Sequence, residues 1–122
     1  MRLFIALDFG GLREDFIKLQ GFLPKNEGLG IAKGFHLTLK FLGEVKADGI
    51  EAIICALKSV KFRHFSVFLD SIGVFYAENC IRVVWVGLTP QDKILELQES
   101  IDESLKGLFK KEKDFKAHIT LA

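Results

Sequence analysis

The chain has 122 residues, a length that fits one domain with a core of its own. Almost half of the residues (49%) are apolar, twelve are phenylalanines and only two are prolines, a composition that excludes intrinsic disorder. The 17 basic and 16 acidic residues leave a formal charge of +1, which excludes attraction to nucleic acid through a global field, so any contact with RNA must be local.

The chain begins with a predicted strand and helix, and we expect residues 1–122 to form a single domain. The segment RLFIALD (2–8) is an apolar run followed by glycines, which predicts a buried strand. Apolar residues at helical spacing over 12–23 then predict an amphipathic helix, and Gly21 and Pro24 end that pattern.

The next segments predict a loop, a strand, a helix and another strand. The glycine-rich stretch 26–34 predicts a loop, and FHLTLKFLG (35–43) alternates as a half-buried strand does. A second amphipathic helix is expected from Asp48 onward. Residues 64–75 alternate well enough to predict a strand, with Gly73 a candidate for a bulge.

The second half of the chain repeats the strand and helix pattern. After a turn at Glu78 and Asn79, the segment IRVVWVGL (81–88) has the strongest strand character in the sequence. Thr89, Pro90 and Asp92 predict a helix cap, a first-turn proline and an acidic third position. The apolar stripe expected for this helix consists of Ile94, Leu97, Ile101, Leu105 and Leu108. A charged loop then precedes a last predicted strand, FKAHITLA (115–122).

These elements form two similar halves. A strand, a helix and FHLTLKFLG make up the first, and a strand, a helix and FKAHITLA make up the second. Equivalent segments bury equivalent faces, so we expect two strand-helix-strand halves related by approximate twofold internal symmetry. Such symmetry would bring the two equivalent strands close to one central groove.

Both of these strands carry a histidine followed two positions later by a threonine. Residues two apart in a strand share a face, so we expect the polar side chains of each motif to project together while the apolar ones enter the core. The side chains expected on the polar face are His36, Thr38, Lys40, Lys116, His118 and Thr120. Those expected in the core are Phe35, Leu37, Leu39, Phe41, Phe115, Ala117, Ile119 and Leu121.

Two imidazoles and two hydroxyls suit the opening of a phosphate ester without a metal. One neutral histidine can take a proton from water while a protonated one gives a proton to the leaving oxygen. Threonine hydroxyls can donate hydrogen bonds to non-bridging oxygens, and the ammonium of Lys40 or Lys116 can help to hold the phosphate. Because the imidazoles would share one anion, the rate is expected to be bell-shaped in pH.

The paired motifs HLTLKFLGEV and HITLA, with an N-terminal RLFIALD strand, resemble the two-histidine (2H) phosphoesterases. The most similar branch comprises the RNA 2′,3′-cyclic phosphodiesterases, which are also called 2′-5′ RNA ligases. The resemblance implies a two-lobed α+β fold with antiparallel sheets flanking a groove, and hydrolysis of a terminal 2′,3′-cyclic phosphate to a 2′-phosphate without cofactor or metal. It also implies further residues after the second motif, so we expect this chain to be a truncated version of the family pattern.

The resemblance also implies a role for each motif residue. His36 corresponds to the acid that protonates the leaving 3′-oxygen, and His118 corresponds to the base that activates water. Thr38 and Thr120 correspond to residues that hold the phosphate oxygens. The implied partners are RNA termini or cyclic nucleotides.

Several simpler interpretations stay open. His36 and His118 could be structural histidines. Lys40 and Lys116 could serve solubility alone, without binding a ligand. His64 is expected on the surface, without a catalytic partner. At the level of function, the alternatives are a binding module that captures RNA ends without turnover and a 2′-5′ RNA end-joining activity.

The cysteines and the apolar runs indicate the compartment. Cys55 and Cys80 have no CxxC spacing, which predicts free thiols in the cytoplasm and argues against a zinc site. No segment is long enough for a membrane span, and Asp8 interrupts the first apolar run too early for a signal peptide. A soluble protein is therefore expected.

Overall fold

The computed structural model describes residues 1–23 and 30–122. In chain order, the elements are β1 (Arg2–Asp8), the 3₁₀ helix η1 (Gly10–Leu12), α1 (Arg13–Gln20), β2 (His36–Glu44), the 3₁₀ helix η2 (Ala47–Gly49), α2 (Ile50–Leu57), β3 (Phe68–Ala77), β4 (Cys80–Thr89), α3 (Asp92–Ser104) and β5 (Ile119–Thr120). The expected helix end at Pro24 and part of the loop expected over 26–34 lie outside the described residues. The α+β class is confirmed.

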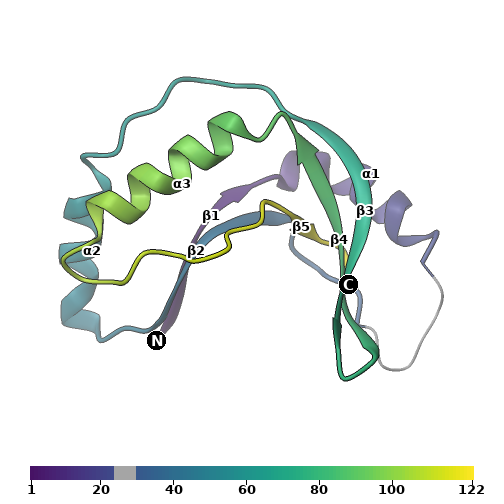
Figure 1. Ribbon diagram of the computed structural model, residues 1–122, viewed down its shortest axis with the longest axis horizontal. Coiled ribbons are helices and arrows are strands. Elements are labelled where there is room, and N and C mark those ends of the chain that lie inside the picture. The colour runs from purple at the N-terminus through teal and green to yellow at the C-terminus, as the bar shows by residue number, and fades with distance from the viewer. Residues whose placement is uncertain (24–29) are drawn as a thin grey trace.

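All five strands belong to one antiparallel sheet with the order β1-β2-β5-β4-β3. The two halves therefore form one continuous sheet, in place of the separate sheets that the resemblance implied, because β5 pairs with β2 on one side and with β4 on the other. Figure 1 shows this sheet bent into an arch, with β1 and β2 in one arm and β3 and β4 in the other.

The helices and one face of the sheet enclose the hydrophobic core. Each helix contributes to it, for example through Phe16 of α1, Ile53 of α2 and Ile94 of α3. The sheet contributes fully buried residues such as Leu37 and Ile119. The alternation of the two motif segments thus predicted correctly which of these residues are inside, and the opposite face of the sheet carries the histidines.

Two register irregularities interrupt β2 and change the face that its later residues occupy. Ala6 pairs with Thr38 but Ile5 pairs with Lys40, so that Leu39 is an extra residue on the β2 side. An extra residue in one strand turns the next side chain to the other face. Lys40 is consequently buried (2% exposed), and Phe41 is 72% exposed. The expectations that Lys40 shares the face of the histidines and that Phe41 lies in the core are both wrong.

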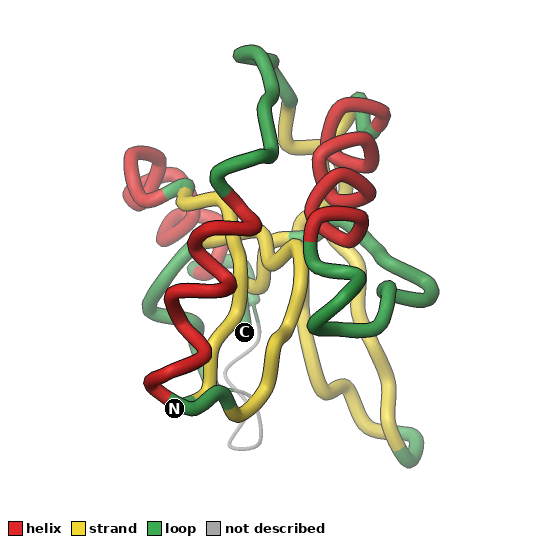
Figure 2. The backbone as a smooth tube through the Cα atoms, turned by 90° about the vertical axis from the view of Figure 1, so that its left-hand side faces the viewer, coloured by secondary structure: helices red, strands yellow, loops and turns green. Residues whose placement is uncertain are grey.

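Three smaller predictions also differ from the structure. The helix α3 begins at Asp92, its N-cap is Gln91 without a side-chain cap, and Thr89 is the last residue of β4. Leu108 is exposed because α3 ends at Ser104, before that residue. The third strand starts later than expected because residues 58–67 first pass over α3 as a loop (Figures 1 and 2).

The buried Lys40 forms an ion pair with α3. Its Nζ lies 2.6 Å from Oδ1 of Asp102, and both side chains are almost completely buried. Burial alone would raise the pKa of the Asp102 carboxyl, but hydrogen bonds from Lys40, Gln98 and the backbone N–H of Glu112 outweigh it, so that the pKa lies below its usual value of 3.8. Asp102 therefore remains ionised at neutral pH and balances the buried ammonium.

We predict that Asp102→Asn destabilises the protein at neutral pH by about 3–5 kcal/mol, because it leaves the buried Lys40 ammonium with only the partly exposed carboxylate of Glu112, 3.8 Å away, as a counter-charge. A carboxyl whose pKa is lowered by folding contributes stability above its unfolded pKa and loses it as the pH falls. The difference from wild type in urea unfolding should therefore be constant at pH 5–7 and shrink below pH 3.8.

The neighbouring Glu103→Gln is the control for this measurement. Glu103 pairs with Lys106 at the same 2.6 Å distance, but both side chains are exposed to solvent. Exposed pairs contribute little, so the control should unfold close to wild type. A difference between wild type and Asp102→Asn that is as large at pH 3 as at pH 7 would contradict the assigned role of the charge.

Candidate active site

The two histidine motifs lie side by side in the middle of the sheet. Leu37 of β2 pairs with Ile119 of β5 in an antiparallel register. When this register is continued, His36 lies opposite Thr120 and Thr38 lies opposite His118. Opposite Cβ atoms in such a pair are about 5 Å apart and diagonal ones about 7–8 Å. All four side chains are half-buried on the face away from the core, so one anion of phosphate size can reach each of them.

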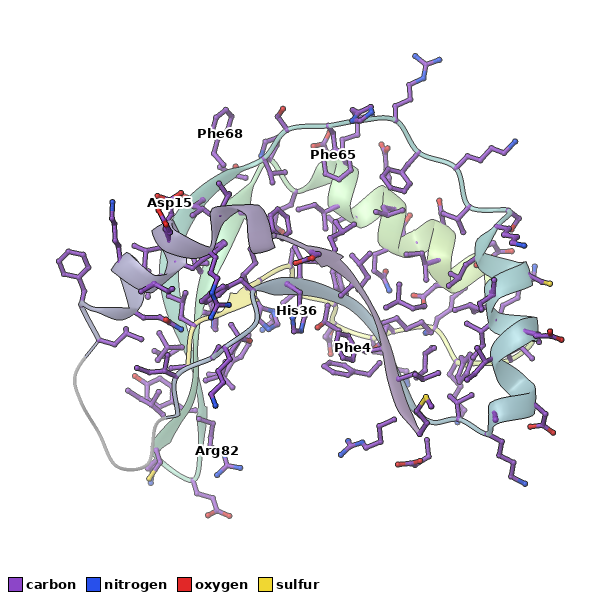
Figure 3. The ribbon with its side chains drawn as sticks, turned by 180° about the vertical axis from the view of Figure 1, so that it is seen from behind. Phe4, Asp15, His36, Phe65, Phe68 and Arg82 are labelled. Carbon is purple, nitrogen blue, oxygen red and sulfur yellow. The ribbon has the colours of Figure 1, made fainter. Side chains whose placement is uncertain are left out.

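His36 is packed against an aromatic side chain of the neighbouring strand. The ring of Phe4 stacks on the imidazole with centroids 5.0 Å apart, and Phe41 lies 6.3 Å from Phe4. Figure 3 shows His36 and Phe4 on the inner side of the arch. In the β1–β2 register, Asp8 lies directly opposite His36. Phe4 and Phe41 were not predicted as site residues, because phenylalanine in a strand is usually a core residue.

His118 is held by a backbone hydrogen bond and by two aromatic rings. Its Nδ1 lies 2.7 Å from the backbone oxygen of Lys116. A carbonyl can only accept, so Nδ1 carries the hydrogen, and in the neutral ring Nε2 is the unprotonated nitrogen. The edge of Phe75 meets the ring at 5.2 Å, and Trp85 lies 6.2 Å away.

The two lysines expected at the site have different locations. Lys116 is exposed next to the second motif, with its Nζ 5.9 Å from the centre of the Phe75 ring. Lys40 points to the opposite side of the sheet and is bound to Asp102. Of these two lysines, Lys116 is therefore the one whose ammonium is exposed and free of the ion pair with Asp102.

No metal-binding group of three or more His, Cys, Asp or Glu side chains occurs in the described part of the chain. A cavity of about 1260 Å³ lies along α3 and is lined by Gln98, Asp102 and Glu112 among others, but it does not include either motif histidine. The candidate site is thus the open face of the sheet around His36 and His118.

Comparisons with known proteins identify the family to which the chain belongs. Residues 12–85 match the family model described as LigT like phosphoesterase. The chain is 36% identical to the RNA 2′,3′-cyclic phosphodiesterase of Archaeoglobus fulgidus, over 99% of this chain and 71% of the relative. The structure of Escherichia coli LigT complexed with 3′-AMP has a TM-score of 0.81 and 29% identity, covering 98% of this chain and 70% of that one.

A crystal structure from Thermus thermophilus is similar over the whole arch. Its TM-score is 0.84 at 25% identity, and the match covers 99% of this chain and 73% of that one. Within the part of the chain that the structure describes, no helix has both the length and the apolar character needed to cross a membrane.

We predict that Gly73→Ala disturbs the site through Trp85. A Cβ at position 73 would lie 2.2 Å from Cζ2 of the indole, so the ring that packs near His118 has to move. Overpacking of this kind costs about 1–3 kcal/mol. Urea unfolding measures this loss, and the fluorescence of the single tryptophan reports the ring displacement.

Gly107→Ala is the matched control, because no atom lies within 4 Å of a Cβ at that position. It should change neither the unfolding midpoint nor the emission spectrum. If Gly73→Ala also left both unchanged, the close packing of the indole over residue 73 would be wrong.

Proposed function

Because the chain belongs to the LigT like phosphoesterases, we propose that it hydrolyses the 2′,3′-cyclic phosphate at RNA ends or in nucleotides to a 2′-phosphate. The observation that carries the proposal is the direct pairing of the two motif strands, which supports a common site for both histidines. The name of the Archaeoglobus fulgidus relative supports the same activity.

The proposed reaction proceeds by proton transfer between the imidazoles and the substrate. Nε2 of His118 accepts a proton from a water molecule as its oxygen attacks the phosphorus. The bond between phosphorus and the 3′-oxygen breaks, and protonated His36 gives its proton to that oxygen. The products are a 2′-phosphate and a 3′-hydroxyl, and the two histidines exchange protonation states during the reaction.

Two structural details support this division of roles. The hydrogen bond from Nδ1 of His118 to Lys116 leaves Nε2 as the basic atom. Asp8 of β1 is the register partner of His36, so a carboxylate residue stands opposite the proposed acid. The resemblance of the motifs to the 2H phosphoesterases leads to the same assignment.

The remaining residues of the site bind the substrate in this proposal. Thr38 and Thr120 donate hydrogen bonds to the non-bridging oxygens, on which negative charge develops. Lys116 supplies a cation on the same side of the sheet. Lys40 is omitted as a phosphate ligand, because its ammonium is buried in the ion pair with Asp102.

RNA termini are the proposed partners, and the cytoplasm is the proposed compartment. Cys55 and Cys80 are both free and exposed, which supports a reducing environment. The continuous sheet through both halves supports the interpretation of residues 1–122 as one phosphoesterase-like domain.

We predict that His36→Ala and His118→Ala each lower kcat on a 2′,3′-cyclic nucleotide by about 10²–10⁴-fold, with chelator present throughout. Loss of the base should also remove the acidic limb of the bell-shaped pH profile, and loss of the acid should remove the basic limb. Product analysis by phosphorus NMR identifies the 2′-phosphate.

His64→Ala is the control for both variants, because His64 is exposed in the loop before β3 and should keep wild-type activity. Full activity in both motif variants would refute the mechanism. Binding of the nucleotide without any product would instead favour a binding module, and joined product with 5′-hydroxyl RNA would favour end joining.

We predict that Phe41→Ala raises KM for the nucleotide with little change in kcat. An exposed ring beside the site can stack on a base, and such stacking contributes about 1–3 kcal/mol, or roughly 5- to 150-fold in affinity. Steady-state kinetics measures both constants, and a ribose 2′,3′-cyclic phosphate without a base should not distinguish the variant from wild type.

Phe68→Ala is a matched control, since its ring is similarly exposed (68%, against 72% for Phe41). Figure 3 shows Phe68 on the outer side of the arch, away from His36. Equal KM changes in the two variants would exclude a base-binding role for Phe41.

A further inference from the structure

A buried set of polar groups connects β2, α3 and the segment that leads to β5, on the core side of the sheet. It consists of the side chains of Lys40, Gln98 and Asp102 with the backbone of Leu39, Lys110 and Glu112, and is here called the Lys40 network. The ammonium of Lys40 donates to Asp102 Oδ1 and to the carbonyl oxygen of Lys110, both at 2.6 Å. Lys40 therefore joins β2 both to α3 and to the segment that follows α3.

Asp102 completes the connection with its second oxygen. Oδ2 accepts a hydrogen bond from Nε2 of Gln98 at 2.9 Å and one from the backbone N–H of Glu112 at 3.1 Å. Nε2 of Gln98 also lies 3.4 Å from the carbonyl oxygen of Leu39. Every buried charge in the network is thus neutralised and hydrogen-bonded.

The network contacts the first motif strand directly and reaches the second only through the segment that leads to it. Leu39 and Lys40 follow directly after Thr38, and they lie at the first register irregularity of β2. Glu112 is six residues before His118, on the segment that leads into β5. β5 itself has only two strand residues, and His118 comes immediately before them, outside the regular strand.

A role in stability alone does not account for the charges. Replacing a buried ion pair with apolar residues of similar size is often neutral or stabilising, because desolvation opposes the attraction between the charges. What a buried, fully bonded pair provides is a unique geometry. Here that geometry relates the strand of His36 to the segment that carries His118.

We propose that Lys40, Gln98 and Asp102 are positioning residues, which hold the two histidines in the relative placement that proton transfer at one phosphate requires. This inference rests on the proposed function and deepens it. None of the three residues is proposed to touch the substrate. Lys40 and Gln98 act through β2, and Asp102 acts through the segment at Glu112 that leads to β5.

The decisive experiment compares Lys40→Met, Asp102→Leu and the double variant. Each single change leaves one buried charge unpaired and should lower the midpoint of urea unfolding. The double variant removes both charges and should recover a midpoint near that of wild type. Its kcat on a 2′,3′-cyclic nucleotide should nevertheless remain about 10- to 100-fold low, with KM changed less than about threefold, because the placement of the histidines is lost.

Two further variants keep the test independent of folding. Gln98→Leu removes a neutral link and leaves the ion pair intact, so it should lower kcat without a large change in unfolding midpoint. Lys106→Met, which removes the exposed pair with Glu103 of α3, should leave kcat at the wild-type value. Recovery of kcat together with stability in the double variant, or wild-type kcat in Gln98→Leu, would overturn the proposal.

Nitrogen NMR of the imidazoles separates this proposal from the proposed function. If wild type does not turn over the cyclic nucleotide, the proposed function fails, but the His118 Nδ1 resonance still reports its hydrogen bond to Lys116. A positioning role requires this resonance to differ between wild type and the folded double variant. Identical His36 and His118 resonances in both proteins would overturn the positioning role.

Discussion

The pairing of Leu37 with Ile119 is the contact on which the rest of the structure depends. Both side chains are fully buried, and each stands between the histidine and the threonine of its motif. Once these two residues meet in the core, the alternation of the strands directs all four polar side chains to the opposite face. The same contact joins the two halves of the chain into one sheet.

The two halves are related but not equivalent, and the difference matters for the chemistry. The first motif lies on a nine-residue strand that is bulged, whereas the second lies on a strand of two residues. His36 stacks on Phe4 opposite a carboxylate residue, and His118 is oriented by a hydrogen bond to its own strand. An acid and a base require different surroundings, and divergence of the two halves can supply them.

The sequence predicted the parts of the site that follow from alternation. His36, Thr38, His118 and Thr120 share a face because their strands are regular at these positions. Lys40 and Phe41 lie on the faces opposite to those expected. The bulge at Leu39 depends on pairing with β1, so the sequence of β2 alone does not predict it. Thr89 does not cap α3, for a similar reason. Its pairing with Phe68 extends β4, and these two residues are far apart in the sequence.

Hydrophobic burial also explains how so short a strand can carry a catalytic histidine in this proposal. A slip of β5 by one residue would exchange the faces of His118 and Thr120 with those of Ile119 and Leu121. Exposing these two fully buried side chains would cost about 3–6 kcal/mol, which is a large part of the roughly 5–15 kcal/mol that stabilises a typical domain. The core thus fixes which residues face the substrate, whereas it does little to fix the tilt of the strand, since apolar contacts are not directional. Directional hydrogen bonds, such as those of Lys40 and Asp102, are the interactions that can fix it.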